Sequence, residues 1–145
     1  MKAMVLDRFG GPEVLYLADI ERPRASPGNV VVQVAFAGVN PADWKAREGW
    51  LASYFQYQFP FVLGFDAAGI IAEVGEGVEG LGTGDRVVTP GNQGMGERGS
   101  YAEYAVVPSW QLVKMPEGLD YSQGAAAMLQ GMTAHYLTHS TWPLK

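Results

Sequence analysis

The sequence predicts a mainly β fold with a few helices, of the barrel or sandwich type. Many short runs of apolar or alternating residues are separated by turns that contain glycine and proline. Glycine makes up 19 of the 145 residues and charged residues only 17%, where about 7% glycine and about 25% charged residues are typical. High glycine with low charge argues against a helical bundle, and the length suits one domain with a buried core.

Three strands are expected in the first part of the chain. Residues 2–7, 14–20 and 30–37 are apolar or alternating and rich in branched side chains. Residues 9–13 contain two glycines and a proline, so they form a turn between the first two strands.

A short helix is predicted directly after the third strand. Asn40 suits the N-cap position, Pro41 the first helical position and Asp43 the first turn. Gly49 is a natural end for this helix.

The second half of the chain repeats the strand pattern and then changes to helix. Further strands are expected at residues 67–74, 86–89 and 100–107. Residues 122–129 and 132–138 have helical character, and we predict one or two helices interrupted near Gly131.

Composition excludes several classes of function. The net charge of −5 disfavours binding to nucleic acid or to anionic membranes. The absence of cysteine excludes disulfides, thiolate metal sites and thiol nucleophiles. Charged residues at the start argue against a signal peptide, and no apolar run reaches 18 residues. We therefore expect a cytoplasmic domain.

Two segments match the dinucleotide-binding pattern G-x-G-x-x-G, at residues 75–80 and 94–99. That pattern binds a pyrophosphate only where a strand turns into a helix. Here a further strand pattern follows each match, and the first match carries two glutamates where an anion would sit. Both are expected to be ordinary glycine-rich turns.

His135 and His139 lie four residues apart and would share one face of a helix, as a zinc pair does. The sequence shows neither a third ligand nor a glutamate between the two. We expect surface or packing histidines and no metal.

Aromatic residues are concentrated between residues 50 and 61, close to Trp44. On an acidic chain they do not indicate nucleic-acid binding. Two interpretations stay open: a packed loop, or an apolar wall of a substrate site.

Five segments, in order, resemble the medium-chain dehydrogenase/reductase superfamily, in particular its zinc-free quinone oxidoreductase branch. They are residues 9–15 (FGGPEVL), 37–43 (AGVNPAD), 61–69 (FVLGFDAAG), 84–87 (GDRV) and 125–134 (AAAMLQGMTA). The resemblance implies a GroES-like, partly open β-barrel over residues 1–120. Residues 121–145 would be a helical segment leading into a Rossmann domain, which relatives of this family have and residues 1–145 do not include.

The departures from the zinc-dependent relatives concern the metal. Asn40 stands where those relatives have a zinc-binding cysteine, and Phe65 stands where they have a zinc-binding histidine. The resemblance therefore implies a zinc-independent oxidoreductase.

The resemblance further implies that NADPH delivers a hydride to a small electron-poor substrate, a quinone or an α,β-unsaturated carbonyl. It places Asn40, Gln130 and Thr133 near the nicotinamide, where uncharged hydrogen-bonding groups suit the carboxamide and ribose. Quinone, enal and enoyl thioester reductases share these motifs, so the exact substrate stays open.

Candidate substrate-binding residues are Asp43, Trp44 and Tyr54. Tyr54 is also the candidate catalytic residue, as a proton donor. Asp43 either orients Asn40 or suits the helix dipole, and we favour the dipole. Asp66 is expected to brace the fold.

Two other functions stay open beside the reductase domain: a stand-alone binding or structural protein derived from this fold and, by analogy of fold alone, a co-chaperonin. On the reductase interpretation residues 1–145 alone are inactive. Apolar residues in 125–129 and 132–137 would then be exposed in this chain, or covered by another copy in a homodimer.

Overall fold

The computed structural model describes residues 1–90 and 99–142. The described strands are β1 (Lys2–Leu6), β2 (Tyr16–Asp19), β3 (Asn29–Gly38), β4 (Phe61–Val62), β5 (Asp66–Val74), β6 (Arg86–Pro90), β7 (Tyr104–Pro108) and β8 (Val113–Lys114). The helical elements are η1 (Pro12–Val14), α1 (Pro41–Arg47), η3 (Ser109–Gln111), α2 (Tyr121–His135) and the π-turn η4 (Tyr136–Thr141). The prediction of a mainly β fold with a few helices is confirmed.

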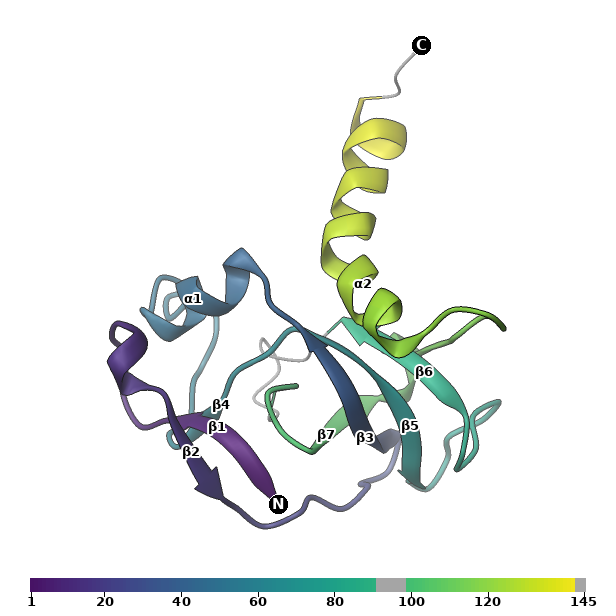
Figure 1. Cartoon of the computed structure of the whole chain (residues 1–145), viewed down its shortest axis with the longest axis horizontal. Coiled ribbons are helices and arrows are strands. Elements are labelled where there is room, and N and C mark those ends of the chain that lie inside the picture. The colour runs from purple at the N-terminus through teal and green to yellow at the C-terminus, as the bar shows by residue number, and fades with distance from the viewer. Residues whose placement is uncertain (91–98, 143–145) are drawn as a thin grey trace.

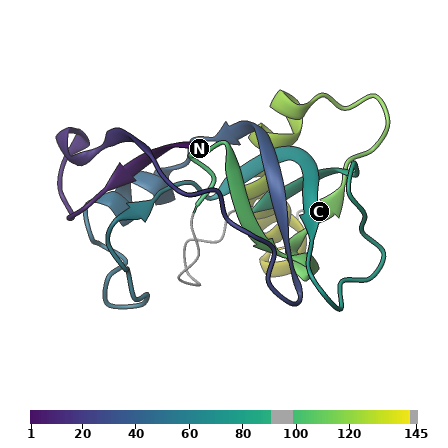
Figure 2. The ribbon, with the colours of Figure 1, turned by 90° about the horizontal axis from the view of Figure 1, so that it is seen from below.

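The strands form two antiparallel sheets that lie side by side (Figures 1 and 2). The larger sheet has the order β7-β3-β5-β6-β8, and the smaller sheet has the order β2-β1-β4. Residues 100–103 join the two sheets: the Met4 N–H donates to the Tyr101 carbonyl (2.8 Å), and the Glu103 N–H donates to the Lys2 carbonyl (3.0 Å). The result is a barrel that is only partly closed.

The larger sheet is buried on one face and partly covered on the other. One face holds a core formed by Val30, Val32, Ile71, Val87, Ala105 and Val107. The other face receives α2, where Ala68 and Val88 of the sheet pack with Met115 and Ala125. The sheet therefore positions α2 as well as closing the barrel.

The short helix after β3 begins and ends where the sequence predicts. Asn40 occupies the N-cap of α1 and Pro41 its first position. Gly49 follows the helix with a φ of +82°, a conformation that side-chain-bearing residues rarely adopt.

The helix α2 leaves the body of the molecule as it proceeds (Figure 1). Its first turns are buried at Gly124 and Ala125, whereas Met132 near its end and Tyr136 and Leu137 of the following η4 are exposed. Of the predicted apolar surface, Ala125 is buried and Met128 and Leu129 are half-buried, whereas the rest of residues 125–129 and 132–137 is exposed.

Two expectations about secondary structure are wrong. Helix α2 continues through Gly131, because an interior glycine costs only about 1 kcal/mol and removes no backbone hydrogen bond. The strand expected over residues 100–107 begins at Tyr104, because residues 100–103 bond to β1 and to residues 62–64 instead. Strands β4 and β8 have two residues each, too few for a periodic signal.

The first glycine pattern, residues 75–80, forms a turn between β5 and β6 with no helix after it, as predicted. In the second pattern, residues 94–99, only Gly99 is among the described residues.

Burial differs between the two faces of β5, and this difference gives a prediction about stability. Ile71 is fully buried in the barrel core, whereas its neighbour Ile70 is 38% exposed on the other face. We expect Ile71→Ala to lower the free energy of unfolding by about 2–5 kcal/mol. Ile70→Ala should cost about 1 kcal/mol or less. Urea unfolding of both variants measures the difference, and equal losses would contradict this assignment of faces.

Candidate functional site

A cleft of about 230 Å³ opens beside the first turns of α1. Asn40, Asp43, Trp44 and Arg47 line it from α1 and its N-cap, and Leu15, Leu63 and Tyr101 line it from other elements. Three of the six residues predicted for the site therefore lie at one cleft. A larger hollow of about 340 Å³, beside β1 and β3, shares only Tyr101 with this cleft and contains none of the predicted residues.

Asn40 is a buried polar group of the cleft whose side chain has two hydrogen-bond partners. Its side chain is buried, and its Nδ2 donates to Asp66 Oδ2 at 3.0 Å. Its Oδ1 lies 3.5 Å from Gln130 Nε2, which donates to it from α2. The two partners determine which way the amide faces, and among residues 1–90 and 99–142 one N–H and one lone pair of the Asn40 side chain stay unused. The structure thus brings together Asn40 and Gln130, as the sequence predicts.

Asp43 holds three elements together from a buried position. Its Oδ2 accepts the Asn40 backbone N–H (2.6 Å) and the Tyr101 hydroxyl (3.0 Å), and its Oδ1 accepts the Phe65 N–H (3.1 Å). Of the two interpretations of Asp43, the contacts favour orientation of Asn40 over a simple dipole effect. Its contact with substrate stays a prediction.

Burial shifts the acidities of this group. Burial raises the pKa of Asp43 above its usual range, although the N–H and O–H donors around it act in the opposite direction. The pKa of Tyr101 is also raised, first by burial and then by the adjacent Asp43 carboxylate. Tyr101 is therefore a poor source of protons, and its hydroxyl proton is directed toward Asp43.

Asp66, at the start of β5, braces the fold as expected. Its Oδ2 accepts both Asn40 Nδ2 and the backbone N–H of Leu129 in α2, each at 3.0 Å. Its Oδ1 is buried and has no hydrogen-bond partner among residues 1–90 and 99–142. Burial is the main cause of the raised pKa of Asp66.

The other predicted residues lie apart from the cleft or at its rim. Tyr54 is 79% exposed in the turn after α1 and does not line the cleft. Thr133 is exposed on α2, and its hydroxyl donates to the Leu129 carbonyl at 2.7 Å. Their proposed roles stay predictions. Trp44 lines the cleft and packs edge-on against Trp50, with ring centroids 5.0 Å apart.

The aromatic residues around 50–61 fit both interpretations left open by the sequence, since some pack in the core and others lie beside the cleft. Tyr57 packs edge-on against Phe9 and Phe61, with ring centroids 5.4 and 4.9 Å apart, and Phe61 is buried. Trp44 and Trp50 are exposed beside the cleft. One part of the aromatic cluster therefore packs in the core, and the other part lies beside the cleft.

Sequence reasoning missed two polar residues of the cleft, Tyr101 and Arg47, besides its apolar residues Leu15, Val39 and Leu63. Arg47 follows Asp43 by four residues, and that spacing puts both side chains on one face of a helix. The spacing could therefore have indicated from the sequence that Arg47 lies beside Asp43. Tyr101 reaches Asp43 only through tertiary structure, 58 residues along the chain, so no local pattern indicates it.

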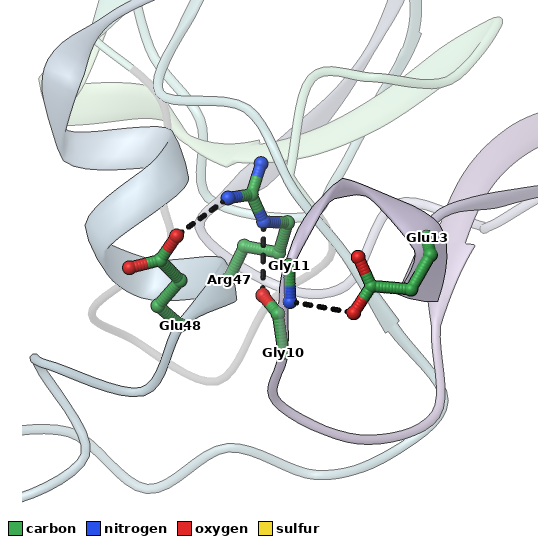
Figure 3. A network of polar contacts seen from close by, with 5 residues as sticks. All are labelled: Gly10, Gly11, Glu13, Arg47 and Glu48. Carbon is green, nitrogen blue, oxygen red and sulfur yellow. Dashed lines mark hydrogen bonds and ion pairs between the residues drawn. The ribbon is translucent and has the colours of Figure 1, made fainter.

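Arg47 connects α1 to the turn before η1 (Figure 3). Its Nε donates to the Gly10 carbonyl at 3.0 Å, and its Nη2 forms an ion pair with Glu48 Oε1 at 2.8 Å. In return, the Gly10 N–H donates to the Arg47 carbonyl at 3.0 Å. Only 12% of the Arg47 side chain is exposed.

The two histidines stack in parallel, with ring centroids 4.6 Å apart and an angle of 5° between the rings. The Thr138 hydroxyl bonds to His139 Nδ1 at 2.8 Å. No group of three or more histidine, aspartate or glutamate side chains in the described part of the chain is arranged to hold a metal ion.

The described helices include none that is long and apolar enough to cross a membrane.

Comparison with known proteins identifies close relatives. Residues 26–117 match the family model of the alcohol dehydrogenase GroES-like domain. The chain is 39% identical to a trans-enoyl reductase from Gibberella fujikuroi, over 92% of the chain and 37% of the relative. It is 38% identical to the quinone oxidoreductase of Homo sapiens, over 97% of the chain and 41% of the relative. It thus spans about two fifths of the length of these relatives.

A solved structure of quinone oxidoreductase from Escherichia coli, complexed with NADPH, has the same fold. It superposes with a TM-score of 0.90 at 29% identity, covering 100% of this chain and 42% of that one.

The raised pKa of Asp66 predicts how stability depends on pH. At pH values between the ordinary pKa near 3.8 and the raised pKa of the folded state, Asp66 keeps its proton in the folded chain but has released it in the unfolded chain. The free energy of unfolding therefore falls as pH rises through this window. Asp66→Asn removes the titration, so the wild type should lose stability relative to this variant as pH rises from 3.8, levelling off above the folded pKa. Urea unfolding across this range measures the difference.

Asp120→Asn provides a control of opposite sign. Hydrogen bonds, first from the Ser122 hydroxyl and then from the Gln123 N–H, lower the pKa of Asp120, the N-cap of α2. Asparagine also caps helices well. Here the wild type should gain stability relative to the variant as pH rises toward 3.8. The same sign for both variants would contradict the assignment.

Proposed function

Because the chain belongs to the alcohol dehydrogenase GroES-like domain family, in its quinone oxidoreductase branch, we propose that it forms the substrate-side domain of a reductase. The reductase transfers a hydride from NADPH to a quinone or an α,β-unsaturated carbonyl. One observation carries the proposal: the buried Asn40 amide, held at the cleft by Asp66 and Gln130, has hydrogen-bonding capacity left for a ligand.

The residues of this chain fit the nicotinamide end of NADPH. A carboxamide needs one donor and one acceptor, and the unused N–H and lone pair of Asn40 offer both. Gln130 and Thr133 are exposed on the same helix and would complete the site. NADPH supplies the hydride, while the chain orients the reactants and keeps water out of an apolar cleft.

The substrate class follows from the relatives and the cleft together. The relatives include a quinone oxidoreductase and a trans-enoyl reductase, which act on quinones and on enoyl groups as their names state. The cleft is small, and Trp44 and Leu63 give it apolar walls suited to a flat, conjugated molecule.

Zinc has no part in the proposed reaction. Asn40 and Phe65 stand where zinc-dependent relatives have ligands, and the Asn40 amide already bonds to Asp66 and Gln130. An amide so engaged and a phenylalanine do not ligate zinc, which prefers thiolate, imidazole and carboxylate groups.

The exposed part of α2 is where the dinucleotide-binding domain would pack. Met132, Tyr136 and Leu137 are each about half exposed there, and a contiguous exposed apolar patch marks an interaction site. Alternatively, a second copy of the chain would pack against this apolar surface. On this proposal residues 1–145 alone neither bind NADPH tightly nor turn over substrate.

Two measurements test the proposal. The full-length protein that contains these residues should oxidise NADPH, followed at 340 nm, when 1,4-benzoquinone or cyclohexenone is added. Residues 1–145 alone should give no fluorescence change with micromolar NADPH. Micromolar binding by residues 1–145, or no NADPH oxidation by the full-length protein with either substrate, would overturn it.

Asn40→Ala tests the role of the amide. Removal of a buried, positioned hydrogen-bonding group should lower kcat/KM of the full-length enzyme about tenfold or more. Asn29→Ala is the matched control, because the Asn29 side chain bonds, among the described residues, only within its own turn, to the Ser26 hydroxyl and the Pro27 carbonyl. Unchanged kcat/KM in Asn40→Ala, with folding verified by thermal unfolding, would remove Asn40 from the site.

A further inference from the structure

The proposed reaction places negative charge on an oxygen atom of the substrate. When a hydride adds to the β carbon of an enone, the displaced π electrons move to the carbonyl oxygen and form an enolate. When it adds to one oxygen of a quinone, they move to the other oxygen and form the hydroquinone anion. Stabilisation of such a charge by a fixed donor is a large part of catalysis. Zinc-dependent relatives have a metal cation for this, and this chain needs another group.

The polar groups of the cleft differ in what they have left to donate. The Tyr101 hydroxyl donates to Asp43, whose carboxylate repels negative charge. The Asn40 amide is held by Asp66 and Gln130 and is neutral. Arg47 is the one cationic side chain among the described residues that line the cleft.

The Arg47 guanidinium has one nitrogen without a partner. Nε and Nη2 bond to Gly10 and Glu48, while Nη1 has no hydrogen bond to the described residues. Because the guanidinium is planar, these two bonds also determine the direction of Nη1, which points away from both partners in Figure 3. The group is therefore preorganised, with 12% of its side chain exposed.

We propose that Arg47 Nη1 donates a hydrogen bond to the carbonyl oxygen of the substrate and stabilises the enolate or hydroquinone anion. This inference rests on the proposed function. Arg47 keeps its proton, and a proton from water converts the anion into product. In the balanced reaction one hydride and one proton reduce the conjugated double bond.

The local charges indicate a neutral substrate. Glu48 balances the Arg47 charge at 2.8 Å, and Asp43 lies one helical turn before Arg47. The cleft therefore offers little net attraction to a carboxylate in the ground state, whereas Nη1 bonds more strongly as charge develops on oxygen. We infer that neutral quinones and enones are reduced in preference to unsaturated acids.

Binding of 4-nitrophenol to this chain tests the role of Arg47 without turnover. Its phenolate carries a delocalised oxyanion like that of the intermediate, and its absorbance near 400 nm reports ionisation. We expect the chain to lower the pKa of bound 4-nitrophenol and Arg47→Gln to weaken phenolate binding about tenfold or more. Arg47→Lys should recover only part of the affinity, because it lacks the planar fork.

Two controls separate this effect from general changes. Arg24→Gln removes an arginine that pairs with Glu73 on the surface and should bind the phenolate as the wild type does. The uncharged 4-nitroanisole should bind the wild type and Arg47→Gln equally. If Arg47→Gln does not fold, the guanidinium ¹⁵N resonances of Arg47 in the wild type must shift with 4-nitrophenolate and not with 4-nitroanisole. Equal phenolate affinity in folded wild type and Arg47→Gln, or no such shift, overturns the inference.

Kinetics of the full-length protein distinguish this inference from the proposed function. If Arg47 acts as proposed, Arg47→Gln lowers kcat about a hundredfold or more, as loss of an oxyanion donor does. Turnover by the wild type with an unchanged kcat in Arg47→Gln refutes the role of Arg47 and leaves the proposed function intact. Absence of NADPH oxidation in the wild type refutes the proposed function itself.

Discussion

Helix α2 reaches the sheet at the ends of β3 and β5, where no side chain separates Gly38 from the carbonyl of Ala125. A Cβ atom at Gly38 would lie 2.7 Å from that carbonyl oxygen, so only glycine permits the approach. At this distance the Leu129 N–H reaches Asp66, and Gln130 reaches Asn40. The orientation of the Asn40 amide thus depends on how closely α2 packs against the sheet.

Two buried carboxylates transmit this packing to the cleft. Asp66 ties Asn40 to α2, and Asp43 ties the Asn40 backbone to Phe65 and Tyr101. Burial of a carboxylate is costly unless donors surround it, and both pKa values are accordingly raised despite the bonds. In return for the free energy spent on burying the carboxylates, the Asn40 amide has a single orientation at the cleft. A catalytic site needs such a fixed orientation more than it needs maximal stability.

The sequence predicted the features that depend on local chemistry. The N-cap at Asn40, the proline after it and the glycine that ends α1 are local signals, and each element lies where they indicate. The resemblance to a family placed Asn40 and Gln130 near the same part of a cofactor, which stays a prediction, and the structure shows in addition a direct contact of 3.5 Å between the two side chains. Tyr101 could not be found in this way, because its contact with Asp43 depends on how residues 100–103 join the two sheets. Tyr54 does not line the cleft, because the path of the turn after α1 is decided by tertiary packing, and its proposed role stays a prediction.

The loss of a metal and the position of Arg47 are connected. Because Asn40 and Phe65 stand where the resemblance puts the zinc ligands of zinc-dependent relatives, the proposed reaction lacks a divalent cation to polarise a carbonyl, and a carbonyl without polarisation resists reduction. Quinones and enones are the substrates for which this loss matters least, because conjugation already spreads the incoming charge. On the proposed function, a single guanidinium, paired with Glu48 and oriented by its bond to Gly10, would hold the oxygen as charge develops. Conjugated carbonyl substrates and an arginine in place of a metal would then be two consequences of one set of substitutions.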